Sequence, residues 1–235
     1  MKLQTIEKQM EKKKLVIAGC GKLGNIVADA VVGGLLDGYE LVGAYSRSRE
    51  KAETLALKVN ERNGHCMVAD TFDQLLDMKP DFLVEAASPA AMREWALPAL
   101  GNGTSVVTLS IGAFADDAFY EEASRVASEN GAHVYIVSGA TGGFDVLQTT
   151  ALMGGAKAEF FNEKGPDALR GTAVYDESLQ KERKTVFTGS AKEAIRVFPT
   201  KVNVTVAASR ASVGPENMNV TMVSTPGFRG DTQRV

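Results

Sequence analysis

One glycine-rich stretch constrains the fold of this chain more than any other feature. It reads Gly19-Cys20-Gly21-Lys22-Leu23-Gly24 and lies between the apolar run 15–18 and the helix-like periodic segment 25–32. In such a setting the first glycine permits a tight turn, the second lets a pyrophosphate approach the backbone, and the third lets helix and strand pack closely. The free N–H groups and the dipole of the helix then face the phosphates. The stretch predicts a dinucleotide site at Gly19, Gly21, Lys22, Leu23 and Gly24, the alternative being a glycine turn that binds no phosphate.

Apolar and periodic segments alternate over the first 137 residues. We expect strands at 15–18, 39–45, 67–69, 81–87, 105–111 and 133–137, and helices at 25–32, 49–60, 71–78, from Ser88-Pro89 onward and at 116–130. Such alternation builds a doubly wound parallel sheet, whose ligands lie at the carboxyl ends of the strands. We therefore predict an α/β fold with a Rossmann dinucleotide-binding domain over 15–137. Further cofactor contacts are expected from Ala87, Ser88 and Ser110 at two of these strand ends.

The alternation stops after Val137. A second glycine turn, 138–143, leads into a predicted helix over 144–153, and later segments are mixed: strand character at 173–175 and 185–187, helices at 192–197 and 203–212, and an alternating strand at 218–224. This mixture predicts a second, smaller α+β domain over 138–235, which we assign to catalysis, substrate binding and dimerisation. Substrate contacts are expected from Thr141 and Gly142.

Composition narrows the classes of partner. The formal net charge of −3 gives no electrostatic reason to expect nucleic acid or an anionic membrane, and no apolar run reaches the roughly 18 residues of a membrane span. Residues 1–14 are rich in lysine and are interpreted as a solvated helical extension, because the apolar run that follows breaks at Gly19. Cys20 and Cys66 suit neither a disulfide framework nor a metal site, which favours a reducing, cytoplasmic setting.

The end of the second predicted strand bears on the choice between NAD and NADP. An acidic residue there accepts hydrogen bonds from the ribose 2′-hydroxyl, whereas a basic residue accommodates a 2′-phosphate. The chain has Ser46-Arg47-Ser48-Arg49 at this place. A planar guanidinium suits a phosphate, so the sequence favours NADP through Arg47, with NAD as the alternative. Both arginines could instead be plain surface residues at the start of the helix that Ser48 caps.

Several motifs together resemble the L-aspartate dehydrogenase family. Besides the glycine stretch they are Glu85-Ala86-Ala87-Ser88-Pro89-Ala90-Ala91-Met92-Arg93, Ser110-Ile111-Gly112-Ala113, Ser138-Gly139-Ala140-Thr141-Gly142-Gly143-Phe144-Asp145 and Phe198-Pro199-Thr200-Lys201-Val202-Asn203-Val204. The resemblance runs from about Leu15 to the end of the chain. It implies a Rossmann domain and a catalytic α/β domain in a homodimer. It also implies oxidation of L-aspartate to iminoaspartate with NAD or NADP, which feeds pyridine-nucleotide synthesis or ends in oxaloacetate and ammonia.

The resemblance also implies roles for single residues. The alanine of the second glycine turn and the asparagine of the Phe-Pro-x-x-x-Asn motif, which contact the cofactor in the family, fall on Ala140 and Asn203. Polar partners of the nicotinamide amide fix which ring face meets the substrate. Capping of a helix is the alternative for Asn203. Lys164, near a basic segment that the family shares, is a candidate for binding a substrate carboxylate, the alternative being a solvated loop lysine.

One position departs from the family. Its catalytic histidine lies in a context like Asn-x-His-x-Ile, which falls here on Asp231-Thr232-Gln233-Arg234-Val235, so Gln233 stands at the histidine position. Glutamine does not titrate near neutral pH, and loss of a general acid or base typically costs about 10² to 10⁴ in rate. His65 and His133 are interpreted as structural. We therefore expect either an amino acid dehydrogenase in which Gln233 orients substrate or water, a cofactor-binding sensor or partner subunit without turnover, or a dehydrogenase of another amino acid.

Overall fold

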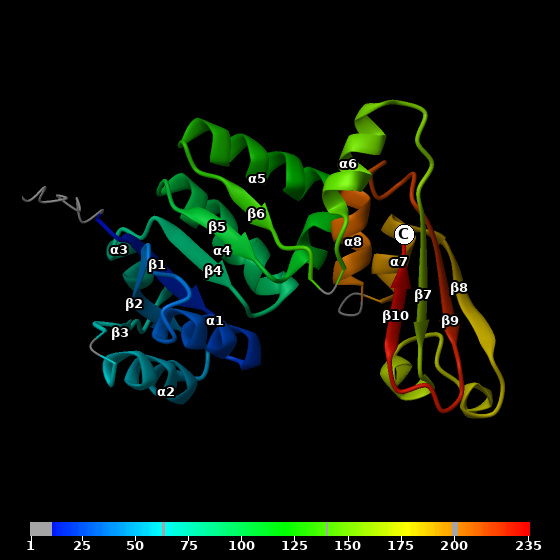
Figure 1. Ribbon diagram of the computed structural model, residues 1–235, viewed down its shortest axis with the longest axis horizontal. Helices are drawn as coiled ribbons and strands as arrows, with labels where there is room; N and C mark the ends of the chain where they lie inside the picture. Colours follow the sequence, from blue (N-terminus) through cyan, green and yellow to red (C-terminus); the bar gives the residue numbers. More distant parts are fainter. Residues whose placement is uncertain (1–10, 63, 140, 199–201) are drawn as a thin grey trace, which may run out of the picture. The chain divides into compact units, whose positions relative to one another are not determined.

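The structure is a computed structural model and describes residues 11–62, 64–139, 141–198 and 202–235 (Figure 1). It divides into two compact units. The first comprises the chain up to Leu109 together with Ala123–Tyr135, and the second comprises Ser110–Glu122 and Ile136–Val235. The division places 110–122 with the second unit, whereas the sequence suggested a single boundary at 137/138. Alanine 140, at the second glycine turn, lies outside the described residues.

The first unit is built on a six-stranded sheet in the order β3-β2-β1-β4-β5-β6. Its strands are β1 (Lys13–Ala18), β2 (Tyr39–Tyr45), β3 (Met67–Val68), β4 (Phe82–Glu85), β5 (Ser105–Thr108) and β6 (Val134–Ile136). The central strand β1 pairs in parallel with both β2 and β4, and its residues from Leu15 to Ala18 are buried. The strand order reverses between β1 and β4, and that is where ligands bind in doubly wound sheets. The predicted Rossmann architecture is confirmed.

Helices follow the strands of the first unit where local signals start them. They are α1 (Lys22–Val32), α2 (Arg49–Asn60), α3 (Phe72–Asp77), α4 (Pro89–Gly101) and α5 (Asp117–Glu129), the last of which begins in the second unit and continues into the first. The hydroxyls of Thr71 and Ser88 accept hydrogen bonds from the Gln74 and Ala91 N–H groups and so cap α3 and α4. Pro89 follows at the first helical position, where its missing N–H costs nothing.

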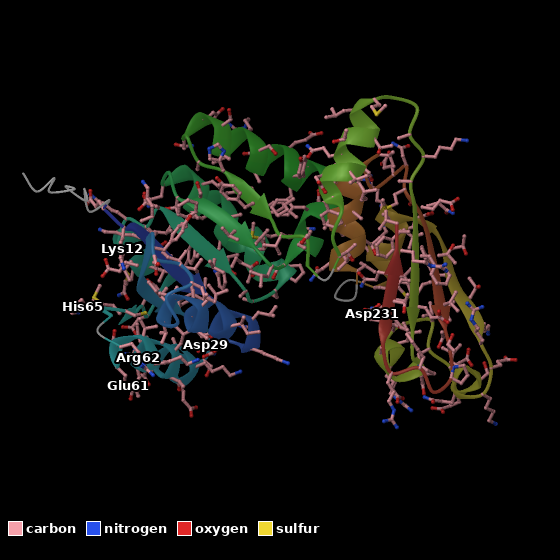
Figure 2. All side chains as sticks on the ribbon, in the orientation of Figure 1. Lys12, Asp29, Glu61, Arg62, His65 and Asp231 are labelled. Atoms are coloured by element: carbon pink, nitrogen blue, oxygen red, sulfur yellow. The ribbon has the colours of Figure 1, made fainter. Side chains whose placement is uncertain are left out.

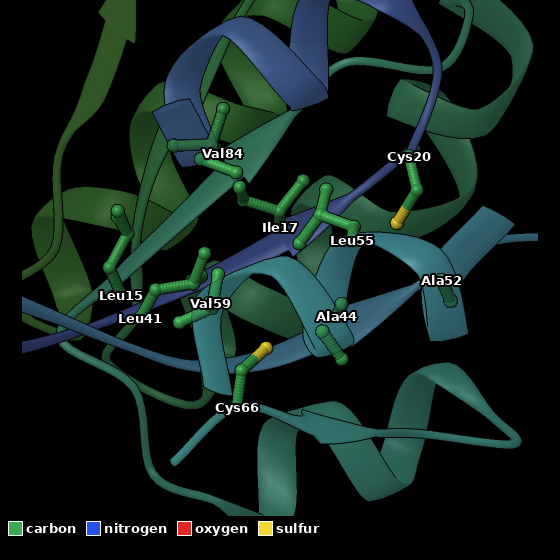
Figure 3. Close-up of a cluster of buried hydrophobic side chains, with 12 residues drawn as sticks. Leu15, Ile17, Cys20, Leu41, Ala44, Ala52, Leu55, Val59, Cys66 and Val84 are labelled. Carbon is green, nitrogen blue, oxygen red and sulfur yellow. The ribbon is translucent and has the colours of Figure 1, made fainter. Parts of the chain in front are cut away.

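A buried apolar cluster joins β1, β2 and α2 of the first unit (Figure 3). Leu15 and Ile17 of β1 meet Leu55 and Val59 of α2 there. Both cysteines belong to this cluster and are free thiols. Burial raises the pKa of the Cys20 thiol to about 11 and that of the Cys66 thiol to about 12, so neither is ionised near neutral pH.

The second unit is built on a four-stranded sheet in the order β10-β7-β9-β8. The strands are β7 (Glu159–Lys164), β8 (Lys184–Ser190), β9 (Asn219–Ser224) and β10 (Asp231–Arg234). The helices are α6 (Phe144–Leu152), α7 (Ala191–Val197) and α8 (Asn203–Arg210), with short 3₁₀ turns η1 (Ile111–Ala115), η2 (Pro166–Leu169) and η3 (Glu177–Gln180). Alanines of α7 and α8 pack against Phe160 and Val220, so one face of the sheet carries the core.

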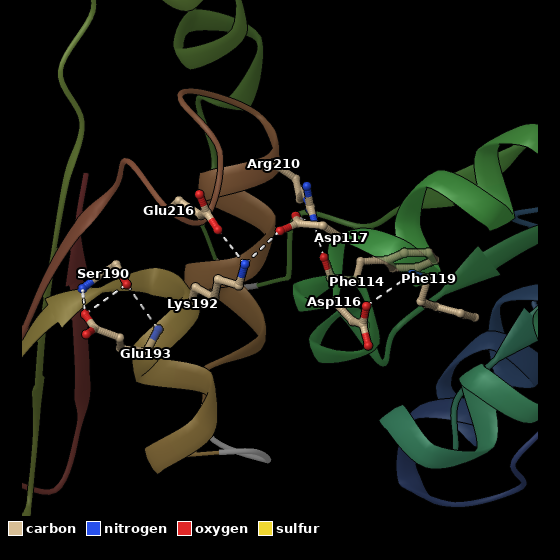
Figure 4. A network of polar contacts seen from close by, with 9 residues as sticks. All are labelled: Phe114, Asp116, Asp117, Phe119, Ser190, Lys192, Glu193, Arg210 and Glu216. Atoms are coloured by element: carbon tan, nitrogen blue, oxygen red, sulfur yellow. Dashed lines mark hydrogen bonds and ion pairs between the residues drawn. The ribbon is translucent and has the colours of Figure 1, made fainter.

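Charged side chains hold the Ser110–Glu122 segment to the helices of the second unit (Figure 4). Asp117 accepts hydrogen bonds from Arg210 at 2.6 Å and from Lys192 at 3.2 Å. Arg210 also donates to the Phe114 carbonyl, and its guanidinium lies over the Tyr120 ring at 4.2 Å. The hydrogen bonds from Arg210 and Lys192 lower the pKa of Asp117. This network explains why 110–122 belongs to the second unit.

The structure corrects four expectations. Lys13 and Lys14 begin β1 and are not part of a helical extension, most of which lies outside the described residues. The fifth strand ends at Thr108, because the chain turns into η1 at Ile111. Residues 173–175 form turns between η2 and η3 and no strand. Strands β7 and β10 were not predicted.

Candidate functional site

The glycine stretch forms a cradle at the end of β1. Gly19 has φ +103°, and a Cβ there would lie 2.5 Å from the Ala86 carbonyl carbon. A Cβ on Gly24 would collide with the Gly19 carbonyl oxygen, whereas a Cβ on Gly21 would meet nothing within 4 Å. Gly21 is the N-cap of α1, and no side chain caps that helix. The cradle therefore fits a pyrophosphate: open space faces the uncapped N–H groups at the start of α1. Lys22 and Leu23, in the first turn of α1, are exposed.

A buried glutamate shapes the neighbouring end of β4. One carboxylate oxygen of Glu85 accepts hydrogen bonds from the Ala87 and Ser88 N–H groups, and the other accepts one from the Thr108 hydroxyl at 2.9 Å. The predicted contacts Ala87 and Ser88 thus lie in a turn whose amide groups are already satisfied. Sequence reasoning placed this turn correctly at a strand end but assigned Glu85 no role in shaping it.

The two arginines after β2 have different surroundings. Arg49 forms ion pairs with Glu53 and Asp70. Arg47 is exposed and makes no ion pair or hydrogen bond within the described part of the chain. Arg47 is therefore the arginine left available for a ligand at the end of β2.

Asn203 does not cap its own helix. The N-cap of α8 is Val202, and the Asn203 side-chain oxygen accepts a hydrogen bond from the Gly112 N–H at 2.9 Å. The capping interpretation is therefore wrong. The contact fixes the amide and joins the start of α8 to η1, while Ser110, the residue before η1, is buried. Within the described residues the Asn203 amide nitrogen has no partner and remains a donor.

A polar cluster occupies one end of the second sheet. The Thr141 hydroxyl donates to the Gln233 side-chain oxygen at 2.7 Å. The Asn162 amide donates to Asp231 Oδ1 at 2.5 Å and to the Thr232 carbonyl at 3.1 Å. The Lys164 ammonium lies 2.6 Å from Asp231 Oδ2. The structure thus brings together the predicted residues Thr141, Lys164 and Gln233, and it disfavours the solvated-loop interpretation of Lys164, which is buried on β7.

Strand register explains why these side chains meet. Asp231 pairs with Lys164, and Gln233 pairs with Asn162 across β10 and β7. Ser224 of β9 is opposite Lys164 in the parallel pairing of β7 and β9, and its buried hydroxyl has no partner among the described residues. Side chains paired across strands lie on the same face. Sequence reasoning missed Asn162, Asp231 and Ser224. The alternation of Phe160, Asn162 and Lys164 was the available signal.

Other predicted residues lie elsewhere. Gly142 is exposed in the second glycine turn. His65 lies beside β3 (Figure 2), and it is exposed in the first unit. His133 precedes β6 and is also exposed in the first unit. Asp231, labelled on β10 in the same figure, belongs to the second unit. No histidine is therefore present in the described part of the second unit.

Comparisons with known proteins identify the family of both parts of the chain. A family model for the homoserine dehydrogenase NAD binding domain matches residues 19–137, and one for the aspartate dehydrogenase C-terminal domain matches residues 145–235. The L-aspartate dehydrogenase of Methanococcus maripaludis is 31% identical over 211 residues, 88% of this chain and 77% of that protein. That of Methanocaldococcus jannaschii is 32% identical over 221 residues, 92% of this chain and 79% of that protein.

A solved structure gives the same result at the level of the fold. The crystal structure of aspartate dehydrogenase from Thermotoga maritima has a TM-score of 0.72 and 26% identity, with 95% of this chain and 83% of that chain covered. The cradle, the two matched domains and these relatives support an NAD(P)-dependent dehydrogenase. The chain belongs to the L-aspartate dehydrogenase family.

Proposed function

We propose that this chain oxidises L-aspartate to iminoaspartate, which then yields oxaloacetate and ammonia or enters pyridine-nucleotide synthesis. The observation that carries the proposal is the polar cluster in which Asn162, Lys164, Asp231 and Gln233 share one face of the second sheet and Thr141 bonds to Gln233. It offers both positive and negative groups, as a dicarboxylic amino acid requires. The bound pyridine nucleotide would accept the hydride. The test is reduction of NADP or NAD on addition of L-aspartate; no reduction with any amino acid of a saturating panel would contradict it.

The cofactor site is assigned to residues of both sequence halves. Gly19, Gly21, Lys22, Leu23 and Gly24 would hold the pyrophosphate, and Arg47 a 2′-phosphate, which favours NADP over NAD. Ala87 and Ser88 would lie along the cofactor, and Ser110, Ala140 and Asn203 at its nicotinamide end. The free amide nitrogen of Asn203 supports its role, because a nicotinamide amide needs a donor of this kind.

A second candidate function is a cofactor-binding sensor or partner subunit without turnover. It is favoured by Gln233, which the resemblance places at the position of the family's histidine and whose side-chain oxygen accepts a hydrogen bond from Thr141. Calorimetric titration with NAD, NADP and L-aspartate separates binding from chemistry. Tight cofactor binding by an inert parent, together with activity gained in Gln233→His, would support the sensor. A parent active on a different amino acid would instead identify another dehydrogenase substrate.

A homodimer is part of the proposal, as the family resemblance implies. Sedimentation of the purified chain tests it. No helix in the described ranges is long and apolar enough to cross a membrane. The cytoplasmic setting suggested by the two cysteines stays a prediction.

A further inference from the structure

Within the described residues, the polar cluster contains two ionisable side chains, Lys164 and Asp231. The side chain of Lys164 is 9% exposed and that of Asp231 is 42% exposed. Asp231 is held from two sides, by Lys164 at one oxygen and by Asn162 at the other. The pair therefore combines an almost enclosed amine with a carboxylate that reaches solvent.

Gln233 cannot receive a proton in this arrangement. Its side-chain oxygen already accepts the Thr141 hydroxyl, which leaves the amide nitrogen, a donor, free to meet a ligand. An amide does not titrate in the working range of an enzyme. If a side chain of the cluster takes a proton from the substrate's amino group, that side chain is therefore not Gln233.

The chemistry of amine oxidation decides between Lys164 and Asp231. The α-ammonium group must lose a proton before its nitrogen lone pair can form the C=N bond. Proton transfer is most effective between groups of similar pKa. An unperturbed α-amino group titrates at roughly 8 and an unperturbed lysine at roughly 10, whereas a carboxyl group titrates near 4. By chemical class an amine therefore matches the substrate's ammonium better than a carboxylate does, and Lys164 is the amine of the cluster.

We propose that Lys164 is the catalytic residue that exchanges the proton of the substrate's amino group, and that Asp231 positions it. The inference rests on the proposed function. In oxidation the neutral Nζ takes one proton from the α-ammonium. The Cα–H bond then breaks, its hydride leaves with the electron pair to the oxidised pyridine nucleotide, and the nitrogen lone pair forms the C=N bond of an iminium product. The proton on Lys164 returns to water beside the exposed carboxylate of Asp231.

The charges around Lys164 set the pH dependence. On its face of the sheet lie Asp231, the Ser224 hydroxyl and, one strand further, Lys184, which is 3.7 Å from Asp176. Glu163, Arg183 and Arg234 belong to the other face, as the alternation along β7 and β10 requires. The group in contact with Nζ is thus the Asp231 carboxylate, at 2.6 Å. Because the proposed base must be neutral to take a proton, oxidation should increase with pH, and the reductive direction, in which Lys164 gives the proton back, should be favoured at lower pH.

Matched lysine variants test the inference. Lys164→Ala should lose about 10² to 10⁴ in kcat for aspartate oxidation, and added ethylamine should restore part of it, because a free amine can take over the proton transfer. Lys164→Arg should keep the ion pair yet stay inactive, since a guanidinium does not deprotonate. Lys184→Ala, on the same face, should leave kcat unchanged. Dinucleotide affinity and thermal unfolding of each variant report whether it is folded.

A second measurement does not depend on turnover. Competitive acetylation of lysines at a series of pH values, quantified for the Lys164 peptide by mass spectrometry, gives the titration of its amine directly. Asp231→Asn should move that midpoint and the rising limb of kcat/KM against pH by the same amount, because one amine is proposed to control both.

The outcomes separate the two proposals. A parent chain that oxidises no amino acid would overturn the proposed function. An active parent in which Lys164→Ala raises only KM, keeps kcat and shows no rescue by ethylamine would overturn this inference alone, and would identify Lys164 as a binder of the substrate carboxylate.

Discussion

At the scale of single residues, the three glycines of the proposed nucleotide site are needed for different physical reasons. Gly19 and Gly24 are required by contacts inside the protein, because a Cβ on either would meet backbone atoms. Gly21 meets nothing, so its missing side chain serves an incoming ligand. The same G-x-G-x-x-G pattern thus encodes two physical demands, close packing and close approach.

These demands predict different results for two alanine variants. Gly24→Ala should lower the free energy of unfolding by about 1–3 kcal/mol, the usual cost of overpacking, because its methyl group meets the Gly19 carbonyl. Gly21→Ala should keep the unfolding free energy of the parent and weaken dinucleotide binding. Chemical denaturation and calorimetric titration measure the two quantities. Equal thermodynamic stability of the two variants would contradict the assignment.

Arginine variants test the preference for NADP. Arg47→Gln should weaken NADP binding roughly ten- to hundredfold, the usual worth of hydrogen bonds to a charged group, and change NAD binding little. Arg49→Gln is the control, because Arg49 is engaged by Glu53 and Asp70. Titration of both variants with both nucleotides gives the ratios. An equal loss of affinity for NAD and NADP in Arg47→Gln would show that Arg47 does not bind the 2′-phosphate.

At the scale of secondary structure, the sequence predicted the first unit better than the second. Strand β2 and helix α2 have the predicted bounds, because an apolar run and a periodic segment of helix length are strong local signals. The predicted cap is wrong in one respect: the side chain of Ser48, the N-cap residue of α2, makes no capping hydrogen bond. Strand β7 was missed because its alternation includes Asn162 and Lys164 at buried positions. Strand β10 is short and polar, and only its pairing with β7 defines it. Val174 and Tyr175 have strand propensity but pack against Leu169 and Phe198 in turns.

The candidate site follows the same division. The nucleotide turn was located from local pattern alone. Lys164 and Gln233 were predicted from the resemblance. Their neighbours Asn162 and Asp231 are 69 residues apart in the sequence, and only the register of β7 and β10 brings them together. Long-range pairing of this kind leaves no mark in a local window.

The stabilisation that the Asp117 network gives the second unit should be lost at low pH. Hydrogen bonds from Arg210 and Lys192 lower the pKa of Asp117 below its usual 3.8, so its contribution is present above about pH 4 and is lost as the pH falls through the folded value. Asp117→Asn should be less stable than the parent at neutral pH and should lose less stability on acidification. Denaturation curves at several pH values measure this. In an Arg210→Met background the substitution should have a smaller effect; full additivity would mean that the two side chains do not interact.

At the scale of the whole molecule, the reactivity of both cysteines depends on the opening of the first unit. Cys20 and Cys66 lie in the core of the first unit, with thiols whose pKa values are raised to about 11 and about 12. Disulfide exchange requires thiolate and access, so a labelling reagent should react only when this unit opens.

Thiol labelling should therefore measure cofactor binding. In Cys20→Ala, which leaves Cys66 as the single thiol of the chain, a dinucleotide at a hundred times its Kd should slow the labelling of Cys66 about a hundredfold. L-Aspartate alone should have no such effect, because its proposed site belongs to the second unit. The labelling rate is measured by the absorbance of the thiol that the disulfide reagent releases. Slower labelling with L-aspartate in the absence of nucleotide would contradict the prediction.

The backbone passes between the two units after Leu109, after Glu122 and after Tyr135. Residues 138–235 are therefore not a complete structural unit by themselves. Expressed alone, they would lack Ile111 and Phe114, both buried, along with Asp117 and the bond from Gly112 to Asn203. A chimera that exchanges the second unit between two relatives would therefore have to include residues 110–122 together with residues 138–235. Without residues 110–122, α8 would lose its contact with η1.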